Sequence, residues 1–149
     1  MELEPLELPA DLKARVDEQI DQALGLEEQH LFAEATRVYK ETLSLIPEPR
    51  HAYWEAMRIY VGFGEIHFAQ QQFEQAMPFY RECFKMPEGY LNSFVLLRVG
   101  ETAFELEDFI TAAEHLTRAL MLDGPEIFEE DPRYFDFLKT VLKAPPGGW

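Results

Sequence analysis

Residues 64–80 read GEIHFAQQQFEQAMPFY, and residues 100–116 read GETAFELEDFITAAEHL. In both stretches a glycine is followed four residues later by phenylalanine, nine residues later by a second phenylalanine and twelve residues later by alanine. The same pattern therefore returns at an offset of 36 residues. A period of about 20 to 50 residues is typical of repeat folds, in which each unit buries its apolar face against its neighbours.

A less regular copy of the pattern precedes these two stretches, at an offset of 41 residues. The matching pairs are Phe32 and Phe73, Ala35 and Ala76, and Tyr39 and Tyr80. The additional residues fall near 47–51, between the first and second copies. We expect this inserted turn to change the curvature of the array at that point.

Apolar residues recur at spacings of three and four along each copy, which predicts pairs of antiparallel helices, and strand patterns are absent. We expect helices near 11–27, 31–46, 51–70, 72–85, 92–106, 108–122 and 132–143. The last helix has the clearest start, because Asp131 can cap free amides and Pro132 suits the first helical position. Pro78 lies inside the fourth expected helix, where we expect a kink or a widened turn.

Small residues recur where two helices of a pair should cross closely, because only Gly or Ala lets the backbones approach while a bulky neighbour fills the gap. The small positions are Ala23, Gly64 and Gly100 on the first helices and Ala35, Ala76 and Ala112 on the second, and the gap is filled by Tyr39, Tyr80 and Leu116. This pattern resembles the tetratricopeptide repeat (TPR) over roughly residues 17–124. The spacings of 36 and 41 residues exceed the usual TPR period of about 34.

The resemblance implies an all-α fold, a TPR-like helix-turn-helix solenoid of three repeats with a C-terminal capping helix, in a single domain over residues 1–149. The expected parts are repeats at about 12–47, 51–88 and 92–124, a capping helix at about 131–143 and a flexible tail at 144–149. The chain ends are expected to be short and frayed.

The composition favours a protein partner over a nucleic acid or a membrane. Acidic side chains number 28 against 13 basic ones, for a formal net charge of −15, so nucleic acid and anionic lipid are repelled while a basic protein is attracted. The charge also serves solubility, so alone it does not decide a function. Cys83 is the only cysteine, and the start of the chain lacks the pattern of a signal peptide, so we expect a cytoplasmic protein.

Chemistry-bearing motifs are scarce, and we expect no enzyme activity, no cofactor and no metal. The four histidines are scattered without metal-ligand spacing. His67 is interpreted as a hydrogen-bonded core residue, Cys83 as a buried inert thiol, and residues 129–131 as a solvated loop with a helix cap.

Residues 97–139, LRVGETAFELEDFITAAEHLTRALMLDGPEIFEEDPRYFDFLK, resemble bacterial TPR-type immunity proteins of polymorphic toxin systems, contact-dependent or Rhs-type. The resemblance implies that the protein binds and neutralises one cognate toxin inside the producing cell. A second similar family is the small acidic TPR chaperones of type III secretion, which hold an amphipathic client. Both families bind proteins, and the identity of the partner is left open by the sequence.

The first helix of each repeat usually lines the concave binding face of such an array. The predicted partner-binding residues are Asp17, Glu27, Arg58, Glu65, Phe68, Phe94, Leu97, Glu101, Phe104 and Glu105. This set is acidic with aromatic anchors, which favours a basic or amphipathic toxin domain or client. The alternatives are that the phenylalanines only pack between helices and that binding uses the convex face or the C-terminal segment. Homo-oligomerisation also stays open.

Overall fold

The computed structural model describes residues 3–149 and confirms the all-α fold. Its α-helices are α1 (Ala10–Glu28), α2 (Phe32–Leu45), α3 (Trp54–Ala69), α4 (Phe73–Glu82), α5 (Ser93–Glu105), α6 (Phe109–Asp123) and α7 (Pro132–Val141). Short 3-10 helices lie at Arg50–Ala52, Cys83–Lys85, Gly89–Leu91 and Pro125–Phe128. Each expected helix is present, with ends that differ by a few residues, and no strand forms within residues 3–149.

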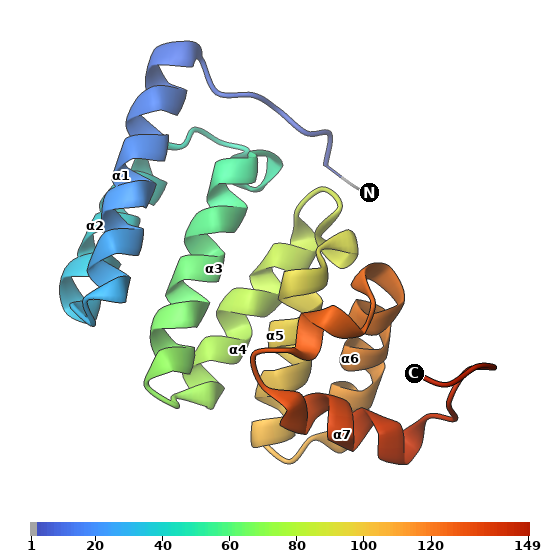
Figure 1. Cartoon of the computed structure of the whole chain (residues 1–149). Helices are drawn as coiled ribbons and strands as arrows, with labels where there is room; N and C mark the ends of the chain where they lie inside the picture. The colour runs from blue at the N-terminus through green and yellow to red at the C-terminus, as the bar shows by residue number, and fades with distance from the viewer. Residues whose placement is uncertain (1–2) are drawn as a thin grey trace. The chain divides into compact units, whose positions relative to one another are not determined.

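The chain divides into two compact units, which are described separately. Unit 1 is Met1–Gly89 and unit 2 is Tyr90–Trp149. Unit 1 holds two helix pairs, α1 with α2 and α3 with α4, and unit 2 holds the pair α5 and α6 followed by α7 (Figure 1). The expectation of a single domain stays a prediction.

The three helix pairs share one turn geometry, which is independent support for the repeat. In each turn one residue has a positive φ, namely His30 at 60°, Gln71 at 59° and Glu107 at 62°. The next amide reaches back five residues: Leu31 N–H donates to Leu26 O, Gln72 N–H to His67 O and Asp108 N–H to Ala103 O. This is the Schellman arrangement, which satisfies carbonyl groups that the end of a helix leaves unpaired.

The close crossings lie where the small residues predict them. A Cβ on Gly64 would be 2.5 Å from the Tyr80 ring, and a Cβ on Gly100 would be 2.6 Å from Leu116 Cγ. Gly62 of α3 makes a comparably close approach to the Tyr39 ring, so Tyr39 also fills the space between the two pairs of unit 1. The small residue and its bulky filler therefore lie in van der Waals contact, as the repeat alignment predicts.

The N-terminal arm differs from the expected frayed end. Leu6 N–H donates to Ala52 O at 3.0 Å, and Leu6 forms an isolated parallel bridge with Tyr53. Leu8 is buried, with 6% of its surface exposed. The expectation was wrong for Leu6 and Leu8, because a backbone hydrogen bond of Leu6 and the burial of the Leu8 side chain hold this part of the arm against the body of unit 1.

Two local expectations concern proline. Asp131 accepts a hydrogen bond from Arg133 N–H, and Pro132 is the first residue of α7, which confirms the predicted start of that helix. Pro78 lies inside α4, which continues as an α-helix to Glu82 and then tightens into the 3-10 turn Cys83–Lys85. The kink at Pro78 stays a prediction.

Candidate functional site

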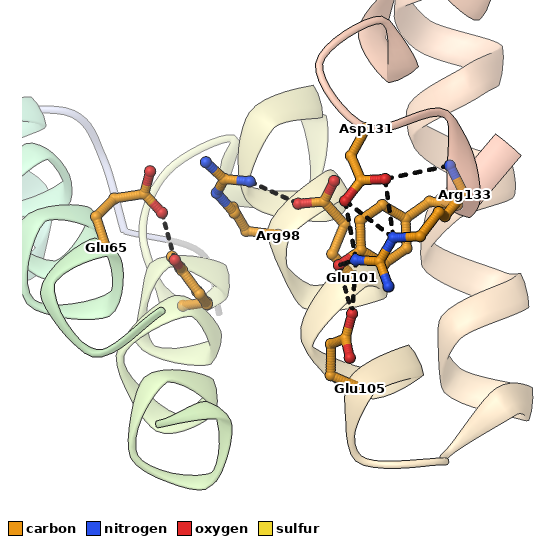
Figure 2. Close-up of polar contacts among 8 residues, drawn as sticks. Glu65, Arg98, Glu101, Glu105, Asp131 and Arg133 are labelled. Atoms are coloured by element: carbon orange, nitrogen blue, oxygen red, sulfur yellow. Dashed lines mark hydrogen bonds and ion pairs between the residues drawn. The ribbon is translucent and has the colours of Figure 1, made fainter. Parts of the chain in front are cut away.

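In unit 1, two buried tyrosines reach from the second helices to carboxylates on the first helices. Tyr39 and Tyr80 are fully buried, yet the Tyr39 hydroxyl donates to Glu27 and the Tyr80 hydroxyl donates to Glu65, both in short hydrogen bonds. Figure 2 shows the Glu65 carboxylate and its bond. A buried phenol needs a hydrogen-bond partner, so the residue that fills the helix gap also orients a carboxylate.

The carboxyl group of Glu27 on α1 has a strongly raised pKa. Burial raises the pKa of its carboxyl from 4.5 to about 7, the hydrogen bond from Tyr39 opposes this rise, and the charges of Glu65 and Glu28 add to it. Burial also raises the pKa of the Tyr39 phenol, so Tyr39 stays a neutral donor. Glu27 therefore changes its charge near neutral pH, where a nearby cation would favour the ionised form.

Earlier in α1, Asp17 and Asp21 lie beside the basic side chains of Lys13 and Arg58. Asp17 accepts from Arg58 at 3.1 Å and from Lys13 at 3.1 Å. Arg58 also lies 3.5 Å from Asp21, whose side chain is 73% exposed. Lys13 bridges across to Glu55 on α3 at 3.0 Å. Arg58 is therefore held by acids of α1 and extends the charged surface across the two first helices.

In unit 2, Glu101, which aligns with Glu65 at the offset of 36 residues, and Glu105 both meet guanidinium groups. Glu101 accepts from Arg98 at 2.6 Å and only 4% of its surface is exposed. Glu105 accepts from Arg133 at 3.1 Å and from the Tyr134 hydroxyl at 2.8 Å. Figure 2 shows Arg133 of α7 between Glu105 and Asp131. The capping helix α7 thus supplies a cation and a phenol to α5.

The predicted aromatic anchors differ in what they contact. Phe68 packs edge-on against Phe73 and Tyr80, with ring centroids 5.4 and 6.5 Å apart. Phe94 is 38% exposed, and the Arg98 guanidinium lies 4.9 Å from its ring centroid. Phe104 lies in an aromatic cluster whose other members are Phe109, Tyr134 and Phe137. Phe104 therefore contributes to the packing of unit 2, as the alternative interpretation of these rings expects.

The structure brings the predicted residues together within each unit and corrects two of them. In unit 1, Asp17 and Arg58 are in direct contact, and Glu27 lies near Glu65. Leu97 and Glu101 were expected to line an exposed face, and both are buried, with exposed fractions of 6% and 4%. Whether any of the ten residues contacts a partner stays a prediction.

Sequence reasoning missed the phenol hydroxyls of Tyr39, Tyr80 and Tyr134 and the cations Arg98 and Arg133. The signal for the first two was available, because a tyrosine at a buried position requires an acceptor for its hydroxyl. Asp21 was also missed, although it lies one helical turn after Asp17.

Two residues singled out for chemistry have ordinary structural surroundings. Cys83 is buried, and burial raises the pKa of its thiol to about 12, so the thiolate is disfavoured. His67 is only half-buried and bonds Gln72 Oε1 at 2.7 Å, so it is hydrogen-bonded but does not belong to the core. Within residues 3–149, no three His, Cys, Asp or Glu side chains gather as a metal site requires.

Of the helices in residues 3–149, none has both the length and the apolar character needed to cross a bilayer. Comparison with protein-family models and with curated proteins yields no match to the chain.

Proposed function

We propose that the protein is a protein-binding module that holds a basic segment of its partner against the carboxylate face of unit 1. This face is defined by Asp17, Asp21, Leu24, Glu27 and Glu28 of α1 and by Arg58 and Glu65 of α3. The observation that carries the proposal is the stripe on α1, because spacings of three and four place Asp17, Asp21, Leu24 and Glu28 on one side of the helix.

The stripe combines charge with an apolar contact. Leu24 lies in its middle and is 43% exposed, and Asp21 and Glu28 beside it are exposed as well. Exposed carboxylates steer a cationic partner during association, whereas an apolar side chain contributes to retention once water is excluded. The net charge of −15 extends the attraction to the whole molecule.

The proposal goes further for the partner, which we take to be a toxin domain that this protein neutralises inside the producing cell. Its support is the resemblance of residues 97–139 to TPR-type immunity proteins, together with the carboxylate face, which suits a basic domain. The decisive experiment sequences the genes on either side of this one and expresses a neighbouring gene product that kills a host, with and without this chain. Rescue of growth supports immunity, and loss of growth with this chain present contradicts it.

The carboxylate face has a separate test on the same pair of proteins. Asp21→Lys with Glu28→Lys should slow association with the toxin domain by about tenfold at low salt, because attraction is replaced by repulsion at exposed positions. The matched control is Glu34→Lys with Glu41→Lys on α2, which changes the net charge equally at exposed positions off the face. Equal on-rates for the two variants, with melting temperatures unchanged, would place binding elsewhere.

A second candidate is a chaperone that holds an amphipathic client. The observation that favours it is the apolar surface at the two ends of α6, where Ile110 is 85% and Met121 80% exposed. A chaperone of this kind would keep a purified secretion translocator soluble in a light-scattering assay, and Ile110→Ser with Met121→Ser would abolish that effect. An immunity protein would leave the translocator's aggregation unchanged.

A further inference from the structure

Unit 1 has an aromatic hollow between α2, α3 and α4, with a volume of about 370 Å³. Its lining includes Lys40 and Leu43 of α2, Tyr60, Phe63 and His67 of α3, and Phe79 of α4. Its size falls within the range of about 300 to 1,000 Å³ that is usual for ligand sites.

The hollow lies on the opposite side of α3 from the carboxylate face. Tyr60, Phe63 and His67 recur at spacings of three and four, whereas Arg58 and Glu65 belong to the other side of the helix. The α3 helix and its neighbours α2 and α4 can be followed in Figure 1. The hollow is therefore a separate surface from the carboxylate face, and a ligand could bind there whether or not the carboxylate face binds a partner.

Aromatic rings form most of the wall. The ring centroids of Phe63 and Phe79 are 5.2 Å apart. The His67 ring stacks on Phe79 with a centroid distance of 5.6 Å and an angle of only 3° between the ring planes. Tyr60 extends the wall, with its ring centroid 6.1 Å from that of Phe63. Phe63 is buried and His67 covers one face of Phe79, so the half-buried rings of Tyr60 and Phe79 supply the accessible aromatic surface, which contacts another planar group at little cost in conformational entropy.

Lys40 is the cationic side chain among the residues that line the hollow, and near Tyr60 the charges of Glu82 and Glu48 are opposed by that of Arg50. Lys40 is exposed and forms no ion pair within residues 3–149, and the residues one turn away on α2 are Thr36, Arg37, Leu43 and Ser44, none of them acidic. His67 Nδ1 donates to Gln72 Oε1 at 2.7 Å, because an amide oxygen only accepts, so Nε2 of the neutral ring is an acceptor and Lys40 is the group that would pair with an anion. A protein with a net charge of −15 thus presents a cation beside an aromatic wall.

We propose that the aromatic hollow binds a segment of a partner protein in which an aromatic side chain lies next to a carboxylate. The ring of that segment packs among Phe63, Tyr60 and Phe79, and its carboxylate pairs with Lys40. Charge complementarity favours this occupant, because Lys40 attracts a carboxylate and repels a basic side chain at the same place.

The test uses three capped tripeptides as probes and the full ¹⁵N-labelled chain as the receptor. Acetyl-Glu-Trp-Glu-amide carries both required features, acetyl-Lys-Trp-Lys-amide reverses the charge, and acetyl-Glu-Ala-Glu-amide removes the ring. We expect the first peptide to shift the amide signals of residues around the hollow in a saturable way, and the other two to bind at least about threefold more weakly. Equal binding of the basic peptide, or shifts confined to other parts of the chain, would overturn the proposal.

Two variants in the hollow and one control variant test whether the peptide binds there. Lys40→Glu should weaken binding of the acidic aromatic peptide by about threefold or more, because an ion pair becomes a repulsion. Arg15→Glu makes the same charge change at an exposed position of α1 and should leave the affinity unchanged. Phe79→Leu, checked for an unchanged melting temperature, should weaken binding through loss of the ring. If Lys40→Glu and Arg15→Glu behave alike, the hollow is not the site.

Discussion

The two units use the same helix packing but balance their carboxylates differently. In unit 1 the fillers Tyr39 and Tyr80 carry hydroxyls that donate to Glu27 and Glu65. In unit 2 the filler is Leu116, which has no donor, and the carboxylates Glu101 and Glu105 accept from Arg98 and Arg133 instead.

The position occupied by Tyr39, Tyr80 and Leu116 therefore has two roles, which are to fill the gap between helices and, where it is a tyrosine, to donate a hydrogen bond. The filler must be bulky in both units, because a glycine lies opposite it, and a tyrosine in that place can also donate to a carboxylate without cancelling its charge, which a leucine cannot do. Unit 1 therefore holds Glu27 with a phenol, whereas α7 of unit 2 supplies Glu105 with both a phenol, Tyr134, and a cation, Arg133. The close packing of small residue and filler is the same within each unit, while the groups that hold the carboxylates differ.

The largest expected effect concerns the shared packing. Gly64→Ala and Gly100→Ala should each destabilise the fold by about 1 to 3 kcal/mol, because the added Cβ overlaps Tyr80 or Leu116 and the core must shift. Gly25→Ala is the matched control, since nothing lies within 4 Å of its Cβ, and it should stabilise by about 0.5 to 1 kcal/mol. Urea unfolding of the three variants measures these values, and a stabilised Gly64→Ala would contradict the close crossing.

The next effect is a pH dependence that should be specific to Glu27 of unit 1. Its pKa rises from 4.5 to about 7 on folding, so the folded state prefers the protonated form. The contribution of Glu27 to stability is therefore fully present below pH 4.5, falls as the pH rises through about 7, and above that is smaller by on the order of 1 to 2 kcal/mol, allowing for partial exposure of the side chain.

Glu27→Gln should remove this part of the pH profile, because the amide oxygen still accepts from Tyr39 but carries no charge at any pH. The measurement compares melting temperatures at pH 5 and pH 8. Glu18→Gln is the control, since Glu18 is exposed on the same helix. A Glu27→Gln variant with the full wild-type pH dependence would assign that dependence to other groups.

Removing the phenol hydroxyl should have a smaller effect. Tyr39→Phe leaves the ring in the gap but takes a donor away from a partly buried carboxylate, at a cost of about 1 kcal/mol near neutral pH. The loss should shrink below pH 5, where Glu27 is protonated. Chemical denaturation at the two pH values tests this, and an equal loss at both would mean that the hydroxyl acts independently of the Glu27 charge.

The smallest effect is expected at the cation of unit 2. Arg133→Ala removes ion pairs with Glu105 and Asp131, but the Arg133 side chain is 60% exposed, and such pairs contribute about 1 kcal/mol or less. Melting temperature should change little, and the small loss should disappear at high salt because exposed charges are screened. A loss as large as that of Gly100→Ala would show that α7 depends on Arg133 for its docking.

The repeat, the helix pairs and the gap-filling residues followed from periodicity, because the side of a helix on which a residue lies depends on its spacing within one segment. The burial of Tyr39, Tyr80 and Cys83 was predictable for the same reason. The start of α7 was predictable as well, since Asp131 and Pro132 act on their own neighbours along the chain.

The partners of the carboxylates depended on the packing of separate helices. Glu105 pairs with Arg133, 28 residues later in the chain. Leu6, near the start of unit 1, donates to Ala52, which lies just before α3. Such contacts require the relative position and rotation of two segments, which no spacing within either segment contains. For that reason Asp17, Glu27 and Glu65 could be placed on the first helices from the sequence, whereas the burial of Glu101 and the pairing of Tyr39 with Glu27 depended on the folded chain.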